Sequence, residues 1–227
     1  TFAFNQYSAK IMKQSPGEML GMIFSMGKIG KDIKRLQDKG YPVKNILDII
    51  QNDNNTNTIV YTSPEFQPCS DTFSDKYAFV GPSVRPASEQ ITKKREKLVY
   101  ISMGTVTNDL VKFYKNCIKA FQDTDYQVMM SIGNLVKIEE LGTLPENISV
   151  FAHVDQIGLL QQADVFLSHC GMNSVNESLY YEVPLVMHPQ TSEQGGVATR
   201  VEQLGAGIRL HKASPSAIYE AVKMVLE

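Results

Sequence analysis

The chain has 227 residues, of which 43% are hydrophobic, so it can bury a substantial core and a folded globular state is expected. Its formal net charge of -2 leaves no general basic excess that would attract nucleic acid or an anionic membrane surface. Cys69, Cys117 and Cys170 are an odd number of cysteines at irregular spacing, which argues against a disulfide framework and a structural zinc site. No apolar run approaches the roughly 20 residues of a membrane-spanning helix, and no secretory signal is visible. We therefore expect a cytoplasmic protein.

The first part of the chain ends in a stretch that is typical of a linker. Residues 17–39 carry apolar side chains at three- and four-residue steps, which predicts a helix. A short apolar run at 58–61 fits a strand, and several prolines and a charged stretch follow it. We expect a first segment over 1–82, a linker over 83–96 and a second domain over 97–227.

Beyond the linker, short apolar strands alternate with helices. We expect strands at 98–102, 126–132, 148–151, 165–168, 185–187 and 206–210, and helices at 109–121, 157–163, 174–181, 194–204 and 215–226. This alternation predicts the α/β class, with a doubly wound parallel sheet covered by helices on both faces. Because such sheets bind ligands outside the carboxyl ends of their strands, residues directly after a strand are the candidates for a site.

Four polar segments follow predicted strands, at 103–105, 153–156, 169–174 and 189–194. In the third, His169 ends a strand, Gly171 permits a tight turn, and Asn173 and Ser174 open a helix. The first-turn amides and the positive dipole end of a helix attract an anion, and a glycine lets a diphosphate approach the backbone. The sequence thus predicts an anion site at this turn.

The same residues also have structural interpretations. Ser174-Val175-Asn176-Glu177 matches the S-x-x-E capping box, so Ser174 and Glu177 can equally serve to cap a helix. A single histidine after a strand, such as His169 or His188, is more often a packed polar residue than a ligand-binding one. The ligand site is favoured because four polar segments fall on one edge of the predicted sheet.

The motifs resemble the donor-site signature of family 1 UDP-glycosyltransferases, and within them the bacterial macrolide-glycosyltransferase-like branch. The resemblance rests on His169–Glu177, Val183–Leu185, Pro189–Gln194 and the S-x-G-[ST] turn at Ser102–Thr105, and the ordered motifs span about residues 98–210. Residues 60–68 and 79–82 resemble the end of the family's acceptor domain. The resemblance implies the two-domain GT-B fold, of which this chain holds the Rossmann-like donor-binding domain and a remnant of the acceptor domain.

The resemblance also implies a role for each matching residue. It assigns the donor diphosphate to Thr105, His169, Gly171, Asn173 and Ser174, the ribose to Glu177, the uracil to His153, Val154 and Gln156, and the transferred sugar to Glu193 and Gln194. The chain departs from the family at two positions, where the usual aromatic residue and proline are replaced by His153 and Asp155. The expected donor is a UDP-sugar, UDP-glucose above all, with no metal and no cofactor.

Asp123-Thr124-Asp125 matches the D-x-D motif, which binds a metal and a nucleotide in the other major glycosyltransferase fold. The motif lies between a predicted helix and the start of a predicted strand, on the edge of the sheet opposite to the ligand edge. We therefore expect a solvated turn there.

Inverting members of the family use a histidine near the start of the acceptor domain as general base. His153, His169, His188 and His211 all lie in the second domain, so the resemblance implies that this chain holds no catalytic residue and is inactive alone. The implied reaction transfers a hexose to a hydroxyl of a small, hydrophobic acceptor such as a macrolide or flavonoid. The alternatives are a non-catalytic nucleotide-sugar-binding subunit that needs a separate acceptor subunit, a GT-B sugar-nucleotide epimerase, and a cell-wall N-acetylglucosaminyltransferase.

Overall fold

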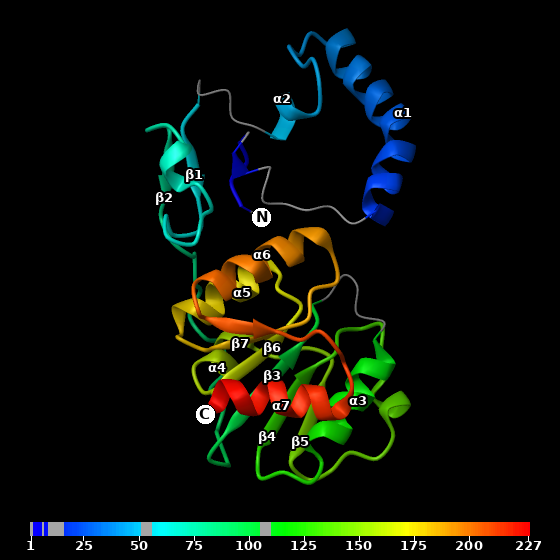
Figure 1. The fold of residues 1–227 in the computed structure, drawn as a ribbon, viewed down its shortest axis with the longest axis vertical. Coiled ribbons are helices and arrows are strands. Elements are labelled where there is room, and N and C mark those ends of the chain that lie inside the picture. The colour runs from blue at the N-terminus through cyan, green and yellow to red at the C-terminus, as the bar shows by residue number, and fades with distance from the viewer. Residues whose placement is uncertain (1, 6, 9–15, 51–55, 105–109) are drawn as a thin grey trace. The chain divides into compact units, whose positions relative to one another are not determined.

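The computed structural model describes residues 2–5, 7–8, 16–50, 56–104 and 110–227. The chain divides into two compact units, Thr1–Gly81 and Pro82–Glu227 (Figure 1). No helix in the described ranges has the length and apolar character that a membrane crossing requires.

In its described residues, the first unit has two α-helices and a pair of short parallel strands. Its elements are α1 (Pro16–Asp38), α2 (Leu47–Ile50), β1 (Thr58–Val60), the short 3-10 helix η2 (Ser70–Thr72) and β2 (Tyr77–Phe79). The helix predicted over 17–39 is confirmed. It ends at Asp38, and the φ of 85° at Gly40 allows the N–H of Tyr41 to donate to the carbonyl of Leu36 over 3.1 Å.

The second unit is built on one six-stranded parallel sheet. Its strands are β3 (Leu98–Ser102), β4 (Gln127–Ser131), β5 (Ile148–Phe151), β6 (Val165–Ser168), β7 (Leu185–Met187) and β8 (Gly207–Arg209). They lie in the order β5-β4-β3-β6-β7-β8, so the strand order reverses between β3 and β6. The doubly wound parallel sheet expected from the alternation of strands and helices is confirmed.

Helices cover both faces of this sheet. They are α3 (Val111–Phe121), the short 3-10 helix η3 (Ile138–Leu141), α4 (Gln156–Leu160), α5 (Met172–Tyr180), α6 (Ser192–Gln203) and α7 (Pro215–Leu226). α3 and α7 pack against each other (Figure 1), and their apolar residues form one core with Val99 and Ile101 of β3. Because side chains alternate along a strand, Tyr100 points to the opposite face, where its hydroxyl meets Gln156 at the start of α4.

The segment 83–96, which the sequence predicts as a linker, belongs to the second unit. The Asp155 carboxylate accepts hydrogen bonds from the backbone N–H of Ser88 over 2.6 Å and of Glu89 over 3.0 Å, and it pairs with the guanidinium of Arg85. Nearer to β3, Lys93 forms an ion pair of 2.7 Å with Asp164. The segment is thus bonded to the unit near both of its ends.

Candidate nucleotide-binding site

The reversal of strand order brings two of the predicted polar turns together. Ser102 at the end of β3 is the register partner of Ser168 at the end of β6. The turn that begins at Met103 and the turn that begins at His169 therefore leave the same edge of the sheet side by side. In doubly wound sheets this switch point is where nucleotides bind.

The imidazole of His169 lies between the backbones of two glycines. A methyl group added to Gly104 would lie 2.6 Å from Nε2 of His169, and one added to Gly171 would lie 2.7 Å from the same atom. Gly104 also has a φ of 79°, which disfavours any side chain. Only glycine at both positions leaves room for the ring. Thr105, which is assigned to the diphosphate by resemblance, lies outside the described residues.

His169 is held towards its neutral form. Burial lowers its pKa below the usual value, and the Ser102 backbone and the charge of Glu193 oppose this shift without cancelling it. The Ser102 backbone lies close to the ring, but no atom in the described part of the chain meets hydrogen-bond geometry with the buried Nδ1. A neutral imidazole has one N–H donor, and a bound anion would favour the protonated ring with two donors.

Helix α5 begins earlier than the sequence suggests. It starts at Met172, its N-cap is Gly171, and no side chain caps it. Ser174 is therefore inside the first turn, and the interpretation of Ser174 and Glu177 as a capping box is wrong. The first-turn amides face the carboxyl edge of the sheet without a capping side chain, as an anion site requires. Asn173, also in this turn, is exposed.

Ser174 and Glu177 instead form a hydrogen-bond network with Gln156, the first residue of α4. The amide Nε2 of Gln156 donates to Oγ of Ser174 over 3.2 Å and to Oε2 of Glu177. Its Oε1 accepts a hydrogen bond of 3.0 Å from the hydroxyl of Tyr100. Gln156, Ser174 and Glu177, which the resemblance assigns to the uracil, the diphosphate and the ribose, are thus in contact. Nothing in the sequence marks Tyr100 as part of the site, because it lies within an apolar strand.

The remaining uracil residues follow β5. His153 is exposed, and its Nε2 lies 2.8 Å from Oδ1 of Asn134, in the turn after β4. Val154 is half-buried. The next residue, Asp155, replaces the family's usual proline and binds the segment 85–89 through its buried carboxylate. A contact across this sequence separation leaves no local pattern, so the sequence could not reveal it.

The residues assigned to the transferred sugar open α6. Thr191 is the N-cap, and its hydroxyl accepts from the N–H of Gln194 over 3.3 Å. Oε1 of Gln194 in turn accepts from the N–H of Gln190 over 2.7 Å and from that of Thr191 over 3.2 Å. The capping box therefore lies here, with the signature T-x-x-Q. Glu193 is exposed, and within the described ranges the Nε2 of Gln194 has no acceptor, so it can donate to a ligand.

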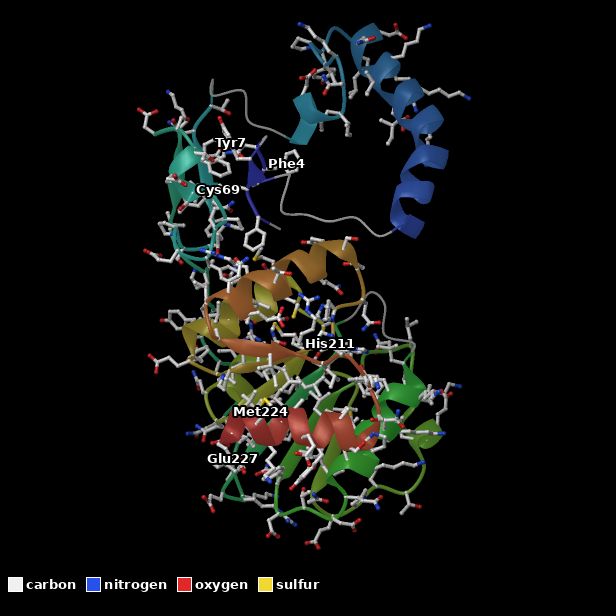
Figure 2. All side chains as sticks on the ribbon, viewed as in Figure 1. Phe4, Tyr7, Cys69, His211, Met224 and Glu227 are labelled. Carbon is white, nitrogen blue, oxygen red and sulfur yellow. The ribbon has the colours of Figure 1, made fainter. Side chains whose placement is uncertain are left out.

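The other two histidines lie apart from this network. The ring of His188 stacks on Phe113 with centroids 5.0 Å apart, in line with the packed role expected of it. His211 follows β8, and its side chain is exposed (Figure 2). Asp123 and Asp125 lie between α3 and β4, on the amino edge of the sheet and opposite to the candidate site. In the described ranges no three acidic, histidine or cysteine side chains come together as a metal site.

A doubly wound sheet with an uncapped helix and an imidazole at its switch point has the architecture of a nucleotide-binding domain. Residues 115–227 match the family model described as "Erythromycin biosynthesis protein CIII-like, C-terminal domain". The chain is 35% identical over 235 residues to the "Uncharacterized UDP-glucosyltransferase YdhE" of Bacillus subtilis (strain 168), a match that covers 100% of this chain and 59% of the relative.

Two further comparisons agree. The "NDP-glycosyltransferase YjiC" of the same strain is 42% identical over 173 residues, which cover 74% of this chain and 44% of the relative. The crystal structure of the calicheamicin glycosyltransferase CalG4 has a TM-score of 0.76 at 26% identity, covering 99% of this chain and 57% of that one. The chain belongs to the family 1 glycosyltransferases, whose members have the GT-B fold. It spans about half the length of the curated relatives that it matches.

Proposed function

We propose that the chain supplies the donor-binding half of an inverting glycosyltransferase that transfers a hexose from a UDP-sugar to a hydroxyl of a small, hydrophobic acceptor. The observation that carries the proposal is the meeting, at the switch point, of His169, the uncapped start of α5 and the network of Gln156, Ser174 and Glu177. The names of the similar proteins favour a glycosyltransferase over an epimerase.

The diphosphate is proposed to bind at the start of α5. Its negative charge interacts favourably with the helix dipole, and the amides of Asn173 and Ser174 donate to its oxygens. Nε2 of His169 lies within 2.7 Å of where a methyl group on Gly171 would lie, so it is close to the same backbone. These donors also stabilise the charge that develops on the leaving diphosphate when the acceptor oxygen attacks the anomeric carbon. This proposal needs neither a metal nor a cofactor.

The ribose, the uracil and the hexose of the donor are assigned to residues around the proposed diphosphate site. We assign the ribose hydroxyls to the Glu177 carboxylate, the uracil to the ring of His153, the backbone of Val154 and the Gln156 side chain, and the hexose to Glu193 and Nε2 of Gln194. A histidine ring offers less stacking area than the family's usual aromatic residue, and one similar protein is named for NDP rather than UDP. We therefore expect TDP to bind within about tenfold of UDP, a difference of about 1.4 kcal/mol.

The catalytic base is proposed to lie outside the donor domain. His169 is enclosed by two glycines, His188 is stacked on Phe113, and His153 contacts Asn134. These contacts support assigning the three rings to roles other than that of the general base. Loss of general-base assistance costs roughly 10²–10⁴-fold in rate. We therefore expect the isolated chain to bind UDP-glucose but to glucosylate a macrolide or flavonoid alcohol only at background rate.

Calorimetric titration tests the donor site. UDP should bind at least about tenfold more tightly than uridine, because the phosphates provide the anion contacts. EDTA should leave this affinity unchanged. His169→Ala should weaken UDP and leave uridine unaffected, whereas His211→Ala, which changes an exposed histidine outside the site, should alter neither. Equal affinities of the wild type for UDP and uridine would refute the donor site.

Adding the family's acceptor domain as a separate polypeptide tests whether that domain supplies the catalytic base. Transfer should appear with the mixture and vanish when the early histidine of the acceptor domain is changed to alanine. Robust transfer by the isolated chain would show that the base lies within it. No transfer by the mixture, with UDP still bound, would support the non-catalytic subunit.

A further inference from the structure

Tyr100 is a buried tyrosine whose hydroxyl points at the candidate site. It lies in the middle of β3, its side chain is 1% exposed, and its ring stacks on that of Phe166 with centroids 4.4 Å apart. Burial raises the pKa of its hydroxyl far above the usual value; the Ser102 side chain opposes this shift, and the nearby charge of Glu177 adds to it. The phenol is therefore a permanent O–H donor at physiological pH.

The direction of each hydrogen bond in the network is fixed by chemistry. An ionised carboxylate only accepts, so the amide that faces Glu177 must present its nitrogen. The amide oxygen of Gln156 then faces Tyr100, and the tyrosine hydroxyl must donate. The result is a one-way relay from Tyr100 through Gln156 to Glu177. Such a relay polarises each member, and it allows a single orientation of the amide.

The relay occupies one side of the Glu177 carboxylate. Oε2 accepts from Gln156, and within the described ranges Oε1 has no such partner, so it is the oxygen that can accept from a ligand. A free glutamate side chain loses rotamer freedom when a ligand fixes it, and a carboxylate that is already held avoids that loss at the moment of binding. Glu177 is half-buried on α5, one turn after the first-turn amides that the anion site uses, so its orientation matters for a group next to the diphosphate.

We propose that Tyr100 is a positioning residue that acts through Gln156 to orient the Glu177 carboxylate for the hydroxyls of a nucleotide ribose. This inference rests on the proposed function, because it takes the nucleoside diphosphate as the ligand. It adds a specificity determinant in a buried strand that itself does not contact the ligand. Its expected consequence is selectivity for a nucleotide with ribose hydroxyls over one that lacks them.

The test compares UDP with 2′,3′-dideoxyuridine diphosphate by calorimetry. Tyr100→Phe removes the hydroxyl and keeps the ring that stacks on Phe166. The variant should bind UDP about three- to tenfold more weakly and the dideoxy nucleotide as the wild type does. Tyr114→Phe is the matched control. Tyr114 is also fully buried, but it lies on α3 in the core that this helix forms with α7. It should leave the ratio of the two affinities unchanged.

A double-mutant cycle separates the relay from a general loss of structure. Gln156→Met breaks the relay at its second member and should reduce the same ratio. Adding Tyr100→Phe to that background should then change the ratio no further. If Tyr100→Phe does not fold, Gln156→Met alone must reduce the ratio for the inference to stand.

The outcomes distinguish this inference from the proposed function. Equal weakening of both nucleotides by Tyr100→Phe, or additive effects in the cycle, would overturn the relay while leaving the donor site intact. Failure of the wild type to bind UDP at all would instead overturn the proposed function.

Discussion

Two helices start at the same edge of the sheet, and their N-termini differ in one respect. α6 is closed by a capping box, in which Thr191 and Gln194 satisfy each other's backbone N–H groups. α5 has Gly171 at its N-cap and no capping side chain. An N-terminus that is capped by its own side chains is stable without a ligand, whereas an uncapped one keeps its donors for an anion. The start of α5 thus has the free backbone donors that the proposed diphosphate site needs, whereas the start of α6 does not.

The largest expected effect comes from adding a methyl group to the uncapped start. In Gly171→Ala the new methyl would lie 2.7 Å from Nε2 of His169, so the ring has to leave its place. UDP affinity should fall at least about tenfold, which is about 1.4 kcal/mol. The matched control is Gly195→Ala in the first turn of α6, where the nearest atom, Nη1 of Arg209, is 4.0 Å away.

Gly195→Ala should leave UDP binding unchanged, and it should stabilise the protein by up to about 1 kcal/mol, because alanine favours a helix. Titration calorimetry and urea unfolding measure the two quantities. Gly171→Ala should also lower stability, because the methyl group displaces the ring of His169. Adding His169→Ala removes that ring, so it should restore stability without restoring the affinity for UDP. The contrast between the two helices would fail if both glycine variants had the same effect on UDP.

A third helix at this edge, α4, sharpens the comparison. Its N-cap, Asp155, does not cap the helix with its side chain, because the carboxylate binds the segment 85–89. Asp155→Ala leaves two backbone N–H groups without their acceptor and should lower the free energy of unfolding by about 1–3 kcal/mol. Denaturant titration at pH 7 measures this loss, and Asp123→Ala in an exposed turn serves as the control.

The contribution of Asp155 should also depend on pH. Burial raises its pKa, but hydrogen bonds from Glu89, Arg85 and Ser88 outweigh burial and lower the pKa from 3.8 to about 2. Below pH 3.8 the unfolded chain therefore binds this proton more readily than the folded protein does. The stability that Asp155 contributes is present above that pH and is lost as the pH falls towards 2. A difference between wild type and Asp155→Ala that persists unchanged at pH 2 would contradict this account.

Smaller and opposite effects are expected when one hydroxyl is removed at the start of α6 and one at the start of α5. Thr191→Ala removes the cap of α6 and should lower stability by about 1 kcal/mol while UDP binding stays the same. Ser174→Ala removes a side chain that contacts Gln156 and should weaken UDP about two- to fivefold, with little change in stability. Loss of stability without loss of UDP binding in Ser174→Ala would return that residue to a purely structural role.

The smallest expected effect is the pH dependence of stability that the buried histidines cause. Burial lowers the pKa values of His169 and His188, so the unfolded state binds protons more readily than the folded state. The free energy of unfolding should therefore decrease as the pH falls below about 6.5. His169→Gln should flatten this decrease, and His211→Gln should not. A slope that His169→Gln leaves unchanged would argue that the ring is not buried in solution.

The sequence predicted the sheet better than the helix starts. Each strand is a short apolar run, and that signal survives without knowledge of the rest of the fold. By contrast, S-x-x-E at Ser174 matches a capping box although α5 begins at Met172, and the operative box at Thr191 uses a glutamine in place of the glutamate. A short polar motif cannot specify whether it precedes a helix or lies within its first turn.

The site was predictable where it depends on the order of the strands and unpredictable where it depends on contacts between distant segments. His169 and Gly171 follow a strand directly, so their place at the carboxyl edge could be inferred. Tyr100 and Gln156 are 56 positions apart, and Asp155 and Ser88 are 67 positions apart. Such pairs form only after the segments have packed, and no periodicity or spacing along the chain encodes them.

Three free cysteines differ in how far they are buried: Cys69 is half-buried in the first unit (Figure 2), and Cys117 and Cys170 are buried in the second. Only a thiolate reacts with an alkylating reagent, and burial raises the pKa of the Cys170 thiol to about 12. Cys170 lies in the turn before α5 with a φ of 68°, so a local opening of that turn exposes it. Cys117 belongs to the core and becomes exposed only when the core itself unfolds. The rate at which Cys170 is alkylated therefore measures how often the turn opens, and a ligand that closes the turn slows this one reaction.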